Sequence, residues 1–287
     1  MVTTARKQLE RRIASVTYGY RYLSLEGALR RIAANGFEAV EIVGTRPHML
    51  PEDFSGEDLA AIAALLAELN LRVVAIAPFS AGSHWHFTAA RAQVRAATID
   101  HVKGCVDLAA SLGAPVVQSI TGAPIIQDVP PREAWRHARD GLRACAEYAE
   151  AHGVRIALEG EDDTLVRSSS EILEMLGDVD HPGIGALFDV GHANMVRGDD
   201  AVRAAEVLLP RLIHIHAHDN DGWRDDHAPI GSGTIDWPQL ARALAHYEGA
   251  ITIEVGSRNP DGVAADGRAF LVEHLLPHVP DEEGPHA

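Results

Sequence analysis

Residues 211–237 read RLIHIHAHDNDGWRDDHAPIGSGTIDW. The opening residues alternate apolar and imidazole side chains, a period of two that is typical of a β-strand. The two predicted faces of this strand are formed by His214, His216 and His218 and by Ile213 and Ile215. Four aspartates and another histidine follow directly. The segment therefore predicts a strand that presents a row of imidazoles inward and turns its isoleucines outward, followed by an acidic loop.

Three further segments alternate in the same way, namely 154–159 (VRIALE), 183–189 (GIGALFD) and 250–254 (AITIE). In each of them bulky apolar side chains share one face, which we expect to pack against helices. The expected helix-facing residues are Val154, Ile156, Leu158, Ile184, Phe188, Ile251 and Ile253. The opposite face of each strand ends in an acid, and these acids are Glu159, Asp189 and Glu254.

The whole chain alternates short apolar runs with longer amphipathic segments, which predicts repeated βα units. The expected strands are 13–18, 38–43, 72–77, 115–119, 154–159, 183–189, 211–218 and 250–254. Clear helical patterns occupy 55–69, 88–112 and 133–152. Eight strands in a chain of 287 residues predict an α/β protein with a closed (β/α)8 TIM barrel. We expect a single domain over 1–287, with its core at about 13–277 and a polar tail at 278–287.

Composition limits the partners and the location of the chain. Its formal charge of −16 opposes binding to phosphate backbones, so nucleic acid is not an expected partner. No apolar run is long enough to span a membrane, and the charged N-terminus lacks the apolar region of a secretion signal, which predicts a cytoplasmic protein. We expect Cys105 and Cys145 to be buried free thiols.

The four strand ends suggest a metal site. Carboxylates crowded together repel one another strongly unless a cation neutralises them. Glu159, Asp189, Glu254 and one histidine of the 214/216/218 row supply oxygen-rich ligands with one imidazole. This set suits one divalent ion, with Mn²⁺ the best candidate and Mg²⁺, Co²⁺ or Zn²⁺ as alternatives. A single acid at a strand end is more often a hydrogen-bond partner, but four such residues on consecutive strands favour a metal.

Several segments resemble a known family. They are LEGEDD at 158–163, LFDVGHANM at 187–195, HIHAHDNDG at 214–222, HAPIGSGTIDW at 227–237 and ITIEVG at 251–256. Together they resemble the sugar isomerase/epimerase family of the xylose isomerase-like TIM-barrel superfamily, to which the endonuclease IV enzymes are more distant. EIVGTRPHMLP at 41–51 resembles the second-strand segment of ketose 3-epimerases.

The resemblance implies the roles of individual residues. It implies that Glu159, Asp189, His216 and Glu254 hold the metal and that His192 contacts the substrate. In the endonucleases the positions of His192, Asp225 and His227 bind a further zinc, but this chain lacks the two other histidines of that trinuclear site. A dinuclear site and a hydrogen-bonded loop are the two alternatives for Asp225 and His227. Relatives commonly form dimers or tetramers, so a homo-oligomer is expected.

The same resemblance implies a reaction on a small keto sugar or polyol derivative. The ion would stabilise the enediolate that forms when a base removes the proton beside a carbonyl. Glu159 and Glu254 would exchange this proton, giving epimerisation or isomerisation, and His192 would serve as an electrophile or proton shuttle. The alternative is a lyase, either a dehydratase or a decarboxylase, acting on a keto-cyclitol or keto-sugar acid. A non-catalytic sugar-binding barrel and a phosphodiesterase follow as weaker alternatives.

Further residues are candidates for substrate binding because they follow strands at the expected mouth. They are Arg46, His48, His84, Trp85, Asp225, His227 and Arg258. The short GSG at 231–233 precedes an expected helix cap at Asp236 and is predicted to be a plain turn rather than a phosphate cradle. We therefore expect a substrate without a phosphate group.

Overall fold

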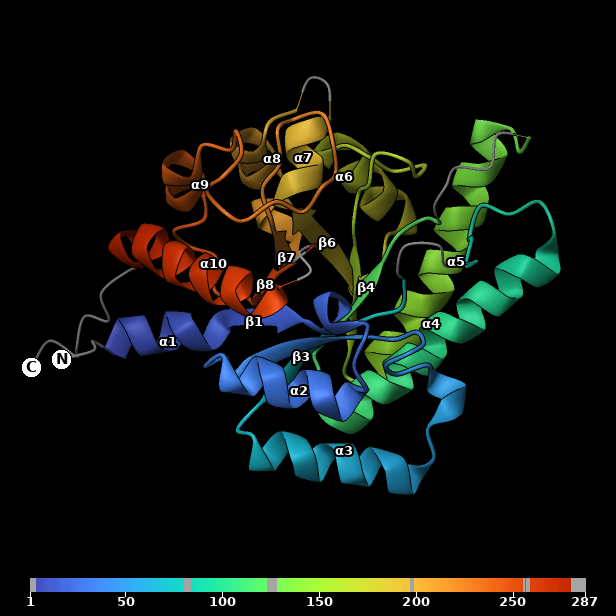
Figure 1. The fold of residues 1–287 in the computed structure, drawn as a ribbon. Coiled ribbons are helices and arrows are strands. Elements are labelled where there is room, and N and C mark those ends of the chain that lie inside the picture. Colours follow the sequence, from blue (N-terminus) through green and yellow to red (C-terminus); the bar gives the residue numbers. More distant parts are fainter. Residues whose placement is uncertain are drawn as a thin grey trace, which may run out of the picture.

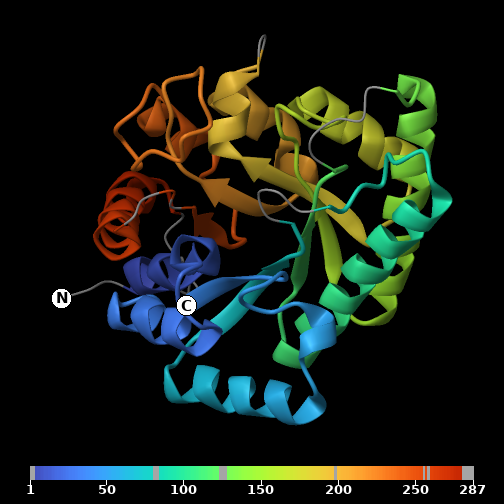
Figure 2. The same ribbon diagram turned by 45° about the vertical axis from the view of Figure 1, so that its right-hand side comes forward.

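The computed structural model describes residues 4–79, 84–122, 128–196, 199–254, 256 and 259–279. Eight parallel strands close into a barrel in the order β1 to β8, so each strand pairs with its neighbours in sequence and β8 pairs with β1 (Figure 1). Two views show the helices lying around the outside of the strands (Figure 2). The predicted (β/α)8 TIM barrel is therefore confirmed.

All eight predicted strands are present, each trimmed by no more than two residues at either end. They are β1 (Ile13–Val16), β2 (Ala39–Val43), β3 (Arg72–Ala77), β4 (Val116–Ser119), β5 (Arg155–Leu158), β6 (Ile184–Asp189), β7 (Leu212–Ala217) and β8 (Ile251–Ile253). The last residues of several predicted strands, including Glu159 and Glu254, lie just beyond the ladder. Their side chains therefore stand at the carboxyl-terminal mouth of the barrel.

The helices are α1 (Thr4–Arg12), α2 (Leu25–Ala34), α3 (Gly56–Glu68), α4 (Ala92–Leu112), α5 (Pro131–Ala151), α6 (Ser169–Val179), α7 (Val190–Met195), α8 (Ala201–Leu208), α9 (Trp237–Ala243) and α10 (Pro260–Leu275). The three predicted helices correspond to α3, α4 and α5, although α4 begins four residues later than expected. Gly113 ends α4 with a φ of 71°, and Asn70 follows α3 with a φ of 53°. These left-handed residues stop each helix before the next strand.

The two faces of the strands separate as the alternation predicts, with one exception. Ile156, Phe188, Ile253 and the other expected helix-facing residues of β5, β6 and β8 pack in the main core. Inside the barrel Ala75, Val116, Ala157 and Leu187 form a separate cluster.

Ile213 is the exception, because it packs against this inner cluster and not against the helices. The pairing register shifts between Ala186 and Leu187 of β6, whose partners in β7 are Leu212 and His214. One residue of β7 is therefore extra, as in a β-bulge, and a strict period of two fails there. The prediction that Ile213 faces outward was wrong for this reason.

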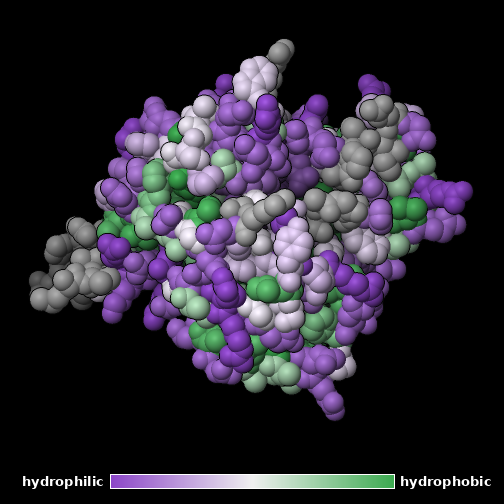
Figure 3. Space-filling model, viewed as in Figure 1, coloured by the Kyte–Doolittle hydropathy of each residue, from purple (hydrophilic) through white to green (hydrophobic). Residues whose placement is uncertain are grey.

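The face of the molecule seen in Figure 3 is mainly polar. Figure 3 shows one face on which hydrophilic side chains predominate and apolar side chains are scattered.

Among the described residues, no helix combines the length and the apolar composition that crossing a bilayer requires. The predicted tail at 278–287 lies outside the described residues apart from His278 and Val279, and its loose character stays a prediction.

Both cysteines are free and buried, as predicted. Burial raises the pKa of the Cys145 thiol to about 12 and that of Cys105 still further. Since the thiolate is the reactive form, we expect neither thiol of the folded protein to react with Ellman's reagent at pH 8, and both to react in guanidinium chloride. Rapid colour development without denaturant would contradict the buried positions of Cys105 and Cys145.

Candidate metal and substrate site

Four polar side chains meet at the carboxyl-terminal mouth, each from a different strand. Glu159 directly follows β5, Asp189 ends β6, His216 lies in β7 and Glu254 directly follows β8. These four strands are neighbours in the barrel, so their ends form one continuous arc. The structure therefore brings together the three acids that the strand pattern singled out and His216, which the family resemblance selected from the histidine row.

The Nδ1 atom of His216 lies among the three acids. It is 3.0 Å from Glu159 Oε1, 3.3 Å from Glu254 Oε1 and 4.0 Å from Asp189 Oδ2. Burial alone would lower the pKa of His216, but the charges of Glu41, Glu254 and Glu159 raise it well above its ordinary value. A proton on this ring thus offsets the surrounding negative charge.

These residues fit a divalent ion. Glu159, Asp189 and His216 each offer a ligand atom within 4.8 Å of the others, and all three are buried. Asp189 Oδ2 has no hydrogen-bond partner among the described residues, although a buried carboxylate oxygen is costly to leave unpaired. Three carboxylates with one imidazole are ligands typical of Mn²⁺, Mg²⁺ or Co²⁺ rather than of a thiolate-seeking metal.

Asp189 also organises the start of α7. Its Oδ1 atom accepts a hydrogen bond from the backbone N–H of His192 over 2.7 Å, which caps the helix and holds His192 at the mouth. The same oxygen lies 3.1 Å from Nε2 of His218. A Cβ atom on Gly191 would stand 2.0 Å from the His218 ring, so this close approach requires glycine.

Two buried residues anchor the acidic loop after β7. The carboxylate of Asp219 accepts from Trp237 Nε1 over 2.8 Å and from the backbone N–H of Gly231 over 3.0 Å. Asn220 donates from Nδ2 to the carbonyl oxygen of Gly191 over 2.8 Å. These bonds tie the loop to α9 on one side and to α7 on the other.

The anchored loop carries Asp225 and His227 to the mouth. His227 Nε2 is 3.2 Å from Asp225 Oδ2, and its Nδ1 is 3.3 Å from Glu254 Oε2. The His227 ring also stacks on that of His218, with centroids 4.0 Å apart. His227 has a φ of 44°, a left-handed conformation that costs a residue other than glycine about 1–3 kcal/mol. Its contacts at the site hold it in this conformation.

Further side chains that could bind a metal lie beside Glu159, Asp189, His216 and Glu254. Asp189, His192 and His218 form one group whose ligand atoms are within 4.8 Å of one another, and His218, His227 and Glu254 form another. The Asp189 and Glu161 charges raise the pKa of His192 to about 10, against the lowering effect of burial. A second ion among these groups stays a prediction.

The chain matches the family model described as "Xylose isomerase-like TIM barrel" over residues 29–274. It belongs to this family. The family resemblance inferred from the motifs at the strand ends is therefore confirmed.

Curated relatives of this family member match along most of their length. The uncharacterised protein MJ1311 of Methanocaldococcus jannaschii is 30% identical over 239 residues, covering 80% of this chain and 79% of that protein. The fructoselysine 3-epimerase of Shigella flexneri is 26% identical over 244 residues, covering 83% of this chain and 88% of the epimerase.

A solved structure described as a D-tagatose 3-epimerase-like protein superimposes with a TM-score of 0.81 at 24% identity. The match covers 93% of this chain and 98% of that one, and it demonstrates the shared barrel. Assembly into a dimer or tetramer stays a prediction.

Sequence analysis did not identify three further side chains that lie at this site. Gln118 donates from Nε2 to Glu159 Oε2, and Glu41 of β2 contacts the far side of the His216 ring. Glu161 offers a ligand atom near Glu159 and His192, and burial together with the Glu159 charge raises its pKa to about 8. The alternation of β2 and β4 could have placed Glu41 and Gln118 inside the barrel. Glu161 lies in a loop, where no such period exists.

The other residues predicted to bind substrate differ in their exposure and in their contacts. Arg46 pairs with Asp53 through bonds of 2.6 and 2.7 Å, and His48 is buried. Trp85 stacks on His101 with ring centroids 4.2 Å apart, so that face of its indole is covered. His84 is exposed. Arg258 lies outside the described residues. A substrate role for each of them stays a prediction.

The four residues Glu159, Asp189, His216 and Glu254, called here the four-residue set, predict that a divalent metal stabilises the folded protein. We expect Mn²⁺ at 100 times its dissociation constant to stabilise the fold by about 2.7 kcal/mol, seen as a rise in melting temperature. Asp189→Asn should lose most of this rise, since asparagine still caps α7 but no longer supplies a carboxylate.

Asp200 is the matched control, because it caps α8 by accepting from the backbone N–H of Arg203 over 2.9 Å and belongs to none of the candidate metal groups among the described residues. Asp200→Asn should keep the full response to Mn²⁺. Equal responses of the two variants would contradict the ligand role of Asp189.

The raised pKa of His227, in the loop after β7, predicts that the stability of the metal-free protein depends on pH. Burial would lower the pKa of His227, but its hydrogen bond to Asp225 and the charge of Glu254 raise it from 6.5 to about 9. A raised pKa stabilises the folded state fully below pH 6.5, and this contribution disappears as the pH rises through 9. In EDTA, the melting temperature should fall between these values, and less steeply in His227→Asn. Parallel curves for the two proteins would rule out this ion pair.

Proposed function

We propose that this protein is a divalent-metal-dependent epimerase that moves the proton beside the carbonyl of a small keto sugar or polyol derivative. Its family membership and the named epimerases among its relatives support an enzyme of this class. The observation that carries the proposal is the position of Glu159 and Glu254, whose carboxylates lie 3.0 and 3.3 Å from His216 Nδ1.

The two glutamates occupy opposite ends of the ligand arc. Glu159 belongs to β5 and Glu254 to β8, with β6 and β7 between them. A divalent ion bound here would act as a Lewis acid that stabilises negative charge on the substrate oxygens. One glutamate removes the proton from one face of the carbon, and the other returns a proton to the opposite face. Configuration at that carbon is thereby inverted.

His192 is placed to act on a substrate oxygen. Its ring is buried beside Asp189, whose charge raises the pKa of His192 to about 10 in the metal-free protein. An imidazolium near the mouth donates a hydrogen bond to an oxygen on which negative charge develops. We therefore assign His192 the role of hydrogen-bond donor or proton shuttle.

The mouth favours a substrate without a phosphate group. The backbone N–H of Gly231, which could otherwise face a phosphate, donates to Asp219 over 3.0 Å. Asp236 caps α9 by accepting from Gln239 N over 3.0 Å, so the GSG segment is a turn that leads into this helix. Near this loop the cluster also contains the carboxylates of Asp225 and Glu254, which repel an anion.

Deuterium exchange tests the proposal directly. The Mn²⁺-loaded protein is incubated in heavy water with a panel of unphosphorylated ketoses and followed by NMR. We expect deuterium to enter beside the carbonyl while a second epimer of equal composition accumulates. Loss of water or CO₂ from the substrate would instead indicate a lyase, and no exchange with any ketose would contradict the proposal.

Single variants test the two glutamates. Glu159→Gln and Glu254→Gln should each lower kcat by at least about 100-fold, because each removes one partner of the proton transfer. Metal content, measured by mass spectrometry, separates loss of the ion from loss of the base. Glu171→Gln changes the capping box of α6 and none of the candidate site residues, so it should leave kcat unchanged.

A further inference from the structure

We propose that Glu41 is a positioning residue that fixes the ring of His216 for metal binding. The inference rests on the proposed function, because it concerns the metal that the four-residue set would hold. Glu41 comes from β2, on the far side of the barrel from β7, and it is not part of that set.

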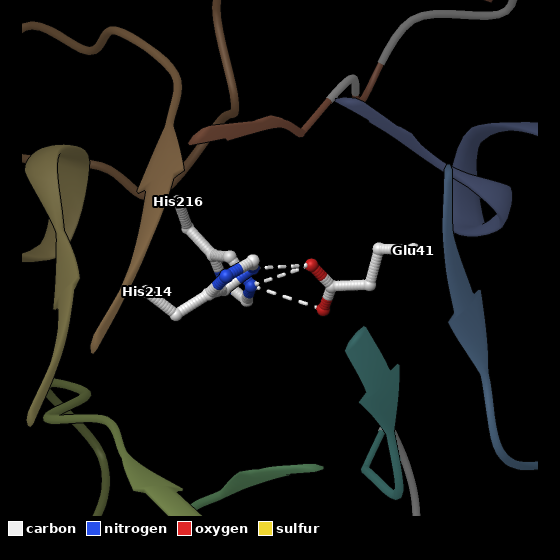
Figure 4. A group of neighbouring side chains, drawn as sticks. All are labelled: Glu41, His214 and His216. Atoms are coloured by element: carbon white, nitrogen blue, oxygen red, sulfur yellow. Dashed lines mark hydrogen bonds and ion pairs between the residues drawn. The ribbon is translucent and has the colours of Figure 1, made fainter. Parts of the chain in front are cut away.

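The contacts of Glu41 span the interior of the barrel. Figure 4 shows its carboxylate facing the rings of both His214 and His216. Glu41 Oε1 is 3.0 Å from His216 Nε2, and Glu41 Oε2 is 2.8 Å from His214 Nε2. Glu41 and His214 are 0% exposed and His216 is 2% exposed, so water does not compete for these bonds.

These bonds determine which ring nitrogen carries the proton. An ionised carboxylate can only accept, so the Nε2 atoms of both His214 and His216 must be protonated. The other nitrogen of His216, Nδ1, is the one that faces Glu159, Glu254 and Asp189. Glu41 thus reserves Nδ1 for the ion and also stops the ring from rotating, as carboxylates behind metal-binding histidines do.

The arrangement requires a carboxylate and not an amide. Glu41 accepts from two protonated rings: Oε2 lies 2.8 Å from His214 Nε2, and His216 Nε2 lies 3.0 Å from Oε1 and 3.2 Å from Oε2. A glutamine at this position has one accepting oxygen and one donating nitrogen, so one ring N–H would face another donor. Glu41→Gln preserves the volume but removes one accepted bond and the negative charge.

A purely structural role for Glu41 makes a different prediction. If Glu41 only fills and stabilises the barrel, its replacement lowers the melting temperature but leaves the state of the His216 ring unchanged. Thr252 provides the matched control, because its Oγ1 lies 3.1 Å from His214 Nε2 and it is fully buried. Thr252→Val therefore perturbs the same cluster without removing a bond to His216.

The test uses the Zn²⁺-loaded protein labelled with ¹⁵N in its histidines, together with Zn²⁺ titrations. In the wild type we expect a His216 ring with a protonated, exchange-protected Nε2 and a metal-bound Nδ1. In Glu41→Gln this Nε2–H signal should be lost or exchange rapidly, and the dissociation constant for Zn²⁺ should rise about 10- to 100-fold. Thr252→Val should keep both the signal and the affinity.

Each outcome decides a separate point. A Glu41→Gln protein with unchanged Zn²⁺ affinity and ring signal would overturn the positioning role while leaving the proposed function intact. A wild-type protein that binds no ion would overturn both. If Glu41→Gln does not fold, the wild-type spectrum alone decides, since an unprotonated or metal-bound Nε2 on His216 is incompatible with the proposed role.

Discussion

The crowding of carboxylates around one imidazole is the constraint on which the functional end of this barrel depends. His216 lies among Glu159, Asp189 and Glu254 on one side and Glu41 on the other, and all of them except the partly exposed Glu254 are buried. Like charges at such distances destabilise a folded chain unless cations balance them. A proton on the ring supplies part of this balance, and a divalent ion would supply more.

The surrounding structure keeps these charges in place. Asp189 is fixed through the first turn of α7, and Gln118 of β4 donates to Glu159. The loop after β7 is held by Asp219 and Asn220, which bond to groups on α9 and α7. Asp189, Glu159 and the loop after β7 are therefore supported by hydrogen bonds from different elements.

The sequence was sufficient for much of this picture because strand alternation is a local property. It predicted eight strands and placed Glu159, Asp189 and Glu254 at one mouth. Ile213 was assigned to the wrong face because the register shift between β6 and β7 depends on pairing, which no single strand encodes. Glu41 was missed because its partners lie across the barrel, more than 170 residues away in sequence. Arg46 and Trp85 have neighbours, Asp53 and His101, that only the folded loops reveal.

Gly191 has a consequence for how this mouth can vary. Its α-carbon faces the imidazole of His218 at a separation that leaves room for a hydrogen atom and nothing larger. The distance between the segments that follow β6 and β7 is therefore so short at this point that only glycine fits at position 191. A substitution at position 191 would displace the His218 ring, so we expect variation in the shape of the mouth to come from the neighbouring loops instead.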